Sequence, residues 1–149
     1  MTDRITKSTI VQGDISHIYN LWANFENFSH FMHNIRSVTK KGNGLSHWVM
    51  EGPLGQDLEW DAKTTQMDED TRIAWNSMEG GDITTSGQVT FNPLPRDQVE
   101  VTVTLQYKAP GGKIGEVLGR IFDNPEEKLE EDLRRFKVYA ESGGHYSSS

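Results

Sequence analysis

Residues 20–35 read NLWANFENFSHFMHNI, and this segment places an aromatic ring at every third position. The rings belong, in order, to Trp22, Phe25, Phe28 and Phe31. On a single α-helix a step of three residues shifts the side-chain direction by roughly 60°, so these rings cannot share one face. We therefore expect two short helices, with Trp22 in the core, Phe25 at a hinge, and Phe28, Phe31 and Met32 at the entrance to a pocket.

The residues before this segment predict a strand followed by a capped helix. Residues 5–11 read ITKSTIV and are rich in β-branched side chains, which favour an extended strand. Gly13 breaks the run, and the Asp14 carboxylate can accept hydrogen bonds from the first free amides of a helix over 15–23. The three-residue period of residues 26–34 favours a second short helix over a strand.

The residues after it alternate between apolar and polar side chains with a period of two, which indicates strands with one buried face. The clearest example is VEVTVTLQY at 99–107. Such segments are separated by turn residues at 42–44, 52–55, 68–70, 79–82 and 92–97. Parallel pairing would need helical crossovers, and the pattern contains none, so we expect six consecutive antiparallel strands.

Residues 113–141 predict helix in two pieces. Pro125 would disturb a continuous helix, so we expect it at the first position of the long helix, with Asn124 as its cap. Two apolar stripes follow helical spacing, one made of Ile114, Val117, Leu118, Ile121 and Phe122 and the other of Leu129, Leu133, Phe136 and Ala140. The last residues, 143–149, have no apolar period and are expected to form a disordered tail, which leaves 1–142 as one domain.

A strand, two short helices, six antiparallel strands and a long closing helix form an α+β layout, in which the helix packs on the concave sheet face. Five segments carry a more specific likeness: IYNLWANFENFSHFM, EWDAKTT, RIAWNS, GQVTFNPL and LEEDLRRFKVY. Over roughly residues 5–141 the chain resembles the polyketide cyclase/dehydrase-like branch of the START and birch-pollen-allergen (SRPBCC) superfamily. Ser29 stands where relatives often carry proline, and this difference should loosen the second short helix slightly.

The resemblance implies a helix-grip fold, in which a curved seven-stranded antiparallel sheet wraps around the carboxy-terminal helix. A cavity between them would hold lipids, sterols, polyketides or other hydrophobic small molecules. The same fold serves carriers, cyclases and stress-linked binding proteins, so the fold alone does not specify a reaction.

Composition excludes several classes of function. A chain of 149 residues can bury a single core without crosslinks, and it contains no cysteine for a disulfide, a thiolate metal site or a nucleophile. The net charge of -7 at pH 7 opposes binding to nucleic acid. No apolar run approaches the ~20 residues that span a bilayer, and the first residues lack the apolar centre of a signal peptide. We expect a cytoplasmic protein, monomeric or homodimeric, without an integral membrane segment.

Aromatic side chains dominate the expected ligand site. The tryptophans, at positions 22, 48, 60 and 75, fall in elements that would face the cavity or its mouth. Indole rings lining a cavity favour a flat or ring-bearing ligand over a plain acyl chain, although regularly spaced aromatics commonly serve only as core. The predicted ligand contacts are Phe28, Phe31, Met32, Trp48, Met50, Trp60, Trp75, Phe91, Tyr107, Ile121, Phe122 and Phe136.

Polar groups suited to chemistry are fewer. His30 and His33 are three residues apart, but no third ligand lies at a signature spacing, so we expect neither a metal nor a cofactor. His47 should point to the face opposite Trp48. Glu59 and Asp61 could divide acid and base roles, but a row that continues with Asp57 and Lys63 is more simply a solvated face. The remaining inward candidates are Tyr107, Asn76, Thr64, Ser77 and Thr85, and none of them forms a recognisable catalytic set.

Three hypotheses about function remain open. The first is a module that sequesters, transports or presents a hydrophobic small molecule such as a lipid, polyketide or aromatic metabolite. The second is a cyclase or dehydratase-like enzyme that folds an extended chain inside the same cavity. The third is a regulatory role with a protein partner, for which an apolar patch around the entrance would be the surface signature.

Overall fold

The computed structural model describes residues 2–52, 56–108 and 125–142. In this part of the chain, seven strands form one antiparallel sheet in the order β1-β7-β6-β5-β4-β3-β2. The elements are β1 (Thr2–Gln12), α1 (Ile15–Ala23), the 3-10 helix η1 (Phe25–His30), β2 (Ile35–Gly42), β3 (Leu45–Glu51), β4 (Asp57–Asp68), β5 (Arg72–Ser77), β6 (Thr84–Leu94), β7 (Gln98–Lys108) and α3 (Pro125–Glu141). The predicted α+β architecture is confirmed, including the six consecutive strands.

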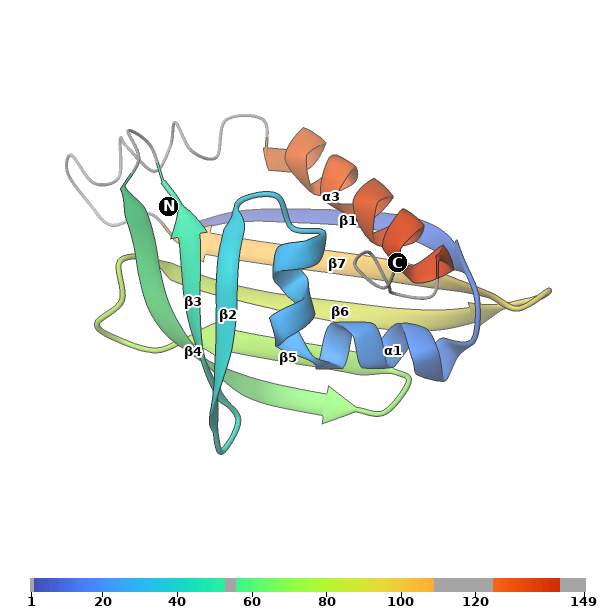
Figure 1. Ribbon diagram of the computed structural model, residues 1–149, viewed down its shortest axis with the longest axis horizontal. Coiled ribbons are helices and arrows are strands. Elements are labelled where there is room, and N and C mark those ends of the chain that lie inside the picture. The colour runs from blue at the N-terminus through green and yellow to red at the C-terminus, as the bar shows by residue number, and fades with distance from the viewer. Residues whose placement is uncertain (1, 53–55, 109–124, 143–149) are drawn as a thin grey trace.

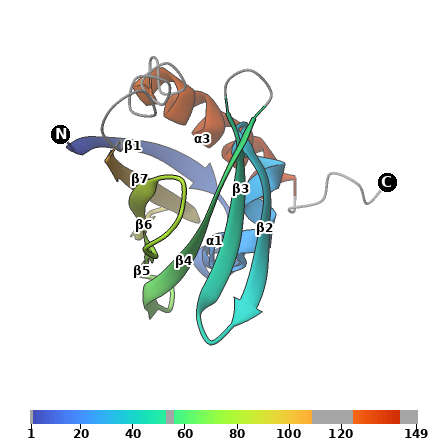
Figure 2. The ribbon, with the colours of Figure 1, turned by 90° about the vertical axis from the view of Figure 1, so that its left-hand side faces the viewer.

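The sheet is strongly curved, and α3 and α1 lie on its concave side (Figures 1 and 2). β2 and β3 run across the direction of β6 and β7, so the sheet wraps partly around the helices. A register shift between Thr64 and Gln66 interrupts the pairing of β4 with β5, and such a bulge increases the local bend and twist of a strand. The curvature leaves room between the sheet and α3.

The entry to α1 follows the sequence prediction. Asp14 has an extended backbone, and its carboxylate accepts a hydrogen bond of 3.2 Å from the backbone N–H of His17. This bond satisfies one of the free amides of the first turn. The preceding strand is longer than the predicted 5–11, because its pairing with β7 runs from Thr2 to Gln12.

The second short helix of the aromatic segment is of a different type from the α-helix that we considered. It is a 3-10 helix, with three residues per turn, so side chains three apart lie nearly one above the other. Phe25 and Phe28 lie on this helix and are both buried, at 4% and 0% exposure, and Phe31, which directly follows it, is 1% exposed. The expected division into two short helices is confirmed, and the drift expected on an α-helix does not separate Phe25 from Phe28 because the second helix has three residues per turn. Phe25 is part of the core rather than only a hinge.

The helix α3 lays its apolar stripe on the concave side of the sheet, beside β1 (Figure 1). The stripe residues Leu129, Leu133 and Phe136 are buried. The Phe136 ring lies 4.7 Å from that of Trp22 and 4.9 Å from that of Phe31, which joins α3 to the two short helices. The predicted long helix is present over Pro125–Glu141, and its predicted start at Pro125 cannot be compared because the preceding residues lie outside the described ranges. The predicted first helical piece, Asn124 as a cap and the tail lie outside the described residues.

Candidate functional site

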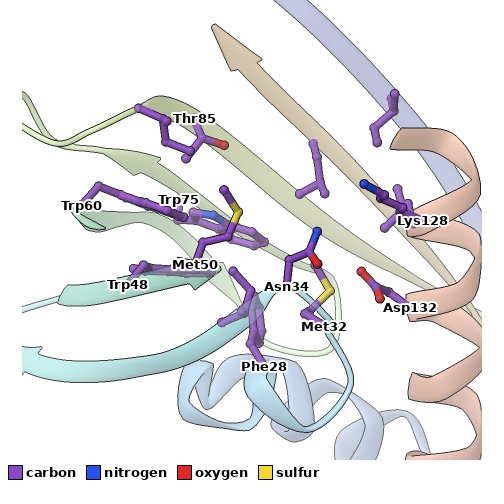
Figure 3. A pocket seen from close by; sticks show the side chains of 15 residues that line it. Phe28, Met32, Asn34, Trp48, Met50, Trp60, Trp75, Thr85, Lys128 and Asp132 are labelled. Atoms are coloured by element: carbon purple, nitrogen blue, oxygen red, sulfur yellow. The ribbon is translucent and has the colours of Figure 1, made fainter. Parts of the chain in front are cut away.

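A cavity of about 110 Å³ lies between the concave sheet face and α3 (Figure 3). One wall is aromatic and comes from η1 and three neighbouring strands: Phe28, Trp48, Trp60 and Trp75. Aliphatic side chains and methionines, among them Ile5, Met32, Met50, Ile83, Leu105 and Leu129, complete most of the lining. Among the described residues, the polar side chains of the lining are Asn34, Thr85, Lys128 and Asp132. A mostly apolar hollow with a few polar groups is the usual form of a small-molecule site.

The three strand tryptophans form a stack. Trp48 is paired directly with Trp60 across β3 and β4, and their ring centres are 5.8 Å apart with planes inclined by 19°. Trp48 and Trp75 are also 5.8 Å apart, at 21°. Phe28 meets Trp48 edge to face at 5.2 Å, an arrangement that aromatic quadrupoles favour. The register of the sheet thus presents the indoles as one platform.

Two glycines leave the space that the indole rings of this platform occupy. Gly87 lies directly opposite Trp75 across β5 and β6, and a Cβ added to Gly87 would overlap the Trp75 indole, reaching 2.7 Å from Cε2. A Cβ at Gly81 would lie 2.5 Å from the Cβ of Trp60. Real side chains do not approach this closely, so only glycine allows the indoles to lie where they do.

The indole donors of the stack differ in their partners. Trp48 Nε1 donates to Ser46 Oγ at 2.8 Å. Trp60 Nε1 is buried and has no hydrogen-bond partner in the described structure. A buried donor without an acceptor costs roughly 1–3 kcal/mol, so Trp60 is held in position by packing rather than by its polar atom.

Asp132 is the buried carboxylate of the site, with its side chain 13% exposed. Its Oδ1 accepts two hydrogen bonds, from the His33 backbone N–H at 3.1 Å and from Arg135 Nη2 at 2.7 Å. Arg135 Nε also donates to the Phe31 carbonyl at 3.4 Å. These contacts tie the chain between η1 and β2 to α3. Burial raises the pKa of the Asp132 carboxyl, against the opposing effect of these hydrogen bonds.

Replacing Asp132 with asparagine is expected to raise the free energy of unfolding near neutral pH. Because burial raises the pKa of this carboxyl above its ordinary 3.8, the folded state binds the proton more tightly than the unfolded chain. Ionisation therefore costs stability, beginning as the pH rises through 3.8 and complete above the raised folded-state pKa. Asparagine avoids this cost and keeps one oxygen for His33 and Arg135.

Urea unfolding of wild type and Asp132→Asn at a series of pH values measures this effect. The excess stability of the variant should shrink as the pH falls toward 3.8. An excess that does not change with pH would contradict the assigned cause.

The structure brings half of the predicted ligand contacts to one cavity: Phe28, Met32, Trp48, Met50, Trp60 and Trp75. It places three others in the core away from the cavity lining. Phe31 and Phe136 pack on Trp22, and Phe91 packs on Tyr19 of α1 at 5.4 Å. They are part of core packing because their elements approach α1 rather than the open part of the concave face. The Tyr107 side chain, Ile121 and Phe122 lie outside the described residues.

Sequence reasoning missed Asp132 and Lys128, the charged residues of the lining. Both lie in the charged run EEKLEEDLRR, which reads as a solvated helix face. The spacing along the helix could have identified Asp132. It is three residues after Leu129 and four before Phe136, so helical periodicity places it on the apolar stripe. Nothing in the sequence distinguishes an aliphatic residue of a cavity wall from one in an ordinary core. This applies to the lining residues Ile5, Ile35, Ile83 and Leu105.

The predicted polar row lies on the opposite face of the sheet from the tryptophans. His47 Nδ1 is 2.8 Å from Asp61 Oδ1, and His47 Nε2 is 2.9 Å from Glu59 Oε1. The hydrogen bonds to Asp61 and then Glu59 raise the pKa of His47. This cluster is partly exposed to solvent and does not reach the cavity, so it has no part in the site.

Two further predictions about polar residues can be placed in the structure. The His30 ring stacks on Tyr139 of α3 at 5.5 Å, and His33 approaches Asp132 through its backbone N–H. Within the described ranges, no three histidine, aspartate or glutamate side chains are grouped so that they could hold a metal ion. Asn76 is exposed, while the Ser77 hydroxyl accepts the backbone N–H of Thr85 at 2.9 Å.

The curved sheet, the closing helix and the apolar cavity between them define a helix-grip fold. The chain belongs to the family described as polyketide cyclase / dehydrase and lipid transport, whose profile matches residues 11–134. The predicted superfamily membership and fold are confirmed.

Three relatives illustrate the relationship. An uncharacterised 17.2 kDa protein of Streptomyces lincolnensis is 30% identical over 143 residues, which cover 95% of this chain and 91% of that protein. The crystal structure of DR_A0006 from Deinococcus radiodurans is 29% identical, with a TM-score of 0.77 over 95% of this chain and 99% of that one. The Zhui aromatase/cyclase from Streptomyces sp. R1128 has a TM-score of 0.77 over 100% and 99% of the two chains. Its identity is 13%, so this likeness shows the fold alone.

None of the helices in the described ranges is long and apolar enough to cross a membrane.

Proposed function

We propose that the protein binds a hydrophobic small molecule in the cavity between the sheet and α3, in order to sequester, transport or present it. The observation that carries this proposal is the aromatic platform of Trp48, Trp60 and Trp75, which faces a hollow instead of close-packed side chains. Well-packed interiors contain few voids larger than a water molecule, so a lined cavity of about 110 Å³ supports a binding role.

The size and lining of the cavity favour a ligand built around a ring. A dry engineered cavity of about 150 Å³ takes up benzene, which sets the scale for a hollow of about 110 Å³. The stacked indoles offer flat faces on which a planar ring gains contact, and an extended acyl chain gains less from them. We infer that the cavity-lining residues named above are the ligand contacts within a single binding domain over 1–142, which acts as a monomer or homodimer.

Filling the cavity should abolish binding without unfolding the protein. Leu105 lines the cavity from β7, and replacing it with phenylalanine adds side-chain volume to the hollow. We expect Leu105→Phe to bind p-xylene at least about tenfold more weakly than wild type, whereas Leu105→Met, which conserves volume, should bind normally. Titration calorimetry measures the affinity, and circular dichroism checks the fold. Equal affinity in a folded Leu105→Phe protein would count against the cavity as the binding site.

Asp132 favours a second candidate function, a cyclase or dehydratase-like enzyme acting in the same cavity. Such a reaction needs a positioned acid or base within hydrogen-bond reach of the substrate, and Asp132 is a buried carboxyl with a raised pKa on the cavity wall. Incubation with cavity-sized ketides tests this function. Turnover that is lost in Asp132→Asn while binding persists would support it, and failure to convert any of them would exclude it.

A further inference from the structure

The two carboxylate oxygens of Asp132 differ in their hydrogen bonds. Both hydrogen bonds that the structure gives this side chain, from His33 N–H and Arg135 Nη2, end on Oδ1. Oδ2 accepts none from the part of the chain that the structure describes. The residue is 91% buried, since its exposure is 9%, and it lines the cavity. One oxygen therefore ties α3 to the chain after η1, and the other keeps its capacity to accept a hydrogen bond at the cavity wall.

The Asp132 side chain extends from α3 toward the cavity, on the side opposite the tryptophans (Figure 3). Lys128, one helical turn earlier, projects from the same side, and Met32 and Asn34 lie between α3 and the indoles. The cavity thus has an aromatic end, made by the stack, and a polar end, made by α3. A molecule that spans it meets rings at one end and a carboxylate at the other.

We propose that the ligand is a small ring-bearing molecule with a neutral hydrogen-bond donor, such as a hydroxyl, which it presents to Oδ2 of Asp132 while its ring lies on the tryptophan stack. This inference rests on the proposed binding function and specifies the chemical class of the ligand.

The chemistry of the polar end selects a donor. In its ionised form the carboxylate accepts hydrogen bonds and donates none, and a donor on the ligand would make a charge-assisted hydrogen bond with it. A ligand with only an acceptor would face the carboxylate unfavourably, and a wholly apolar one would make no hydrogen bond with it. Arg135 contacts this carboxylate and Lys128 lies one turn away, so positive charge is already present. A neutral hydroxyl suits this end better than another cation.

Three probes of nearly equal size separate these possibilities. 4-Methylphenol carries a hydroxyl that can donate, 4-methylanisole has only an ether acceptor, and p-xylene has neither. At about pH 7.5 the phenol is neutral. We expect wild type to bind 4-methylphenol about 10- to 100-fold more tightly than the other two, the range for a hydrogen bond to a charged group. Titration calorimetry gives the three affinities.

The variant Asp132→Asn replaces the second oxygen with a hydrogen-bond donor and removes the charge of the carboxyl group. Asparagine Oδ1 can keep the bonds from His33 and Arg135, which places the Nδ2 amide, a donor, where Oδ2 was. We expect the preference for 4-methylphenol over 4-methylanisole to disappear or reverse, with little change for p-xylene. Glu131→Gln is the matched control, because it removes one negative charge from the neighbouring exposed position of α3 and should keep the wild-type preference.

The outcomes separate this inference from the proposed function. Equal affinity of all three probes for wild type, or a hydroxyl preference that survives in Asp132→Asn, overturns the inference and leaves cavity binding intact. Failure of wild type to bind any of the three overturns both. A hydroxyl preference that Asp132→Asn removes and Glu131→Gln keeps supports the inference.

Discussion

Replacing Phe136 with alanine is expected to lower the free energy of unfolding by about 3–5 kcal/mol. Phe136 is fully buried, and its ring lies against those of Trp22 and Phe31. Through these contacts it joins α3 to α1 and to the end of η1, so its removal opens a void where three elements meet. A loss of this size is a large part of the stability of an ordinary domain, and the variant should unfold at a much lower urea concentration.

Val138→Ala on the same helix is the control for this prediction. The Val138 side chain is 60% exposed, so its truncation should change the free energy of unfolding by no more than about 0.5 kcal/mol. Urea unfolding followed by far-ultraviolet circular dichroism measures both variants. If Phe136→Ala cost less than about 1 kcal/mol, the assignment of Phe136 to the core rather than to the ligand site would be wrong.

The second large effect is expected at Gly87. An alanine there would overlap the indole of Trp75, and Trp75 cannot move freely because it is buried against Trp48 and Phe28. Overpacking of this kind typically costs about 1–3 kcal/mol. The displaced indole should also enter the cavity, so we expect Gly87→Ala to bind p-xylene at least about tenfold more weakly.

The double variant Gly87→Ala/Trp75→Phe tests whether this contact is the cause. Phenylalanine is smaller than tryptophan, so it should accommodate the added methyl group, and the two substitutions together should cost less than the sum of their separate effects. Ser86→Ala, one residue earlier in β6, adds no atom and should leave binding unchanged. Additive costs in the double variant would show that Gly87 acts through something other than the Trp75 indole.

Much of the fold could be predicted because its signals are local. Asp14 before an apolar helix and the alternation of 99–107 each follow from the chemistry of a few neighbouring residues. The type of the second short helix, which was not foreseen, also has a local origin in the spacing of Phe25, Phe28 and Phe31. Their spacing of three fits a 3-10 turn as well as it fits drift on an α-helix, and only burial against Trp48 and Trp75 decides between the two.

The site was less predictable because the sequence does not show which buried residues pack directly on one another and which leave a cavity between them. Phe136 and Leu129 lie on one helical stripe, yet the first packs on Trp22 and the second lines the cavity. Hydrophobic spacing gives both residues the same inward face. What separates them is their position along α3, because Phe136 meets the rings of Trp22 and Phe31 and Leu129, about two turns earlier, lies at the cavity. Asp132 was hidden for another reason, since carboxylates seldom lie on an apolar face.

The central claim is that the cavity holds a hydrophobic small molecule, and native mass spectrometry tests it most directly. The purified protein is incubated with a whole-cell lipid and metabolite extract, and retained molecules are then released under denaturing conditions. We predict one discrete ring-bearing mass per chain on wild type, absent from Leu105→Phe. A protein that retains nothing, or that retains the same mass when the cavity is filled, would contradict the claim.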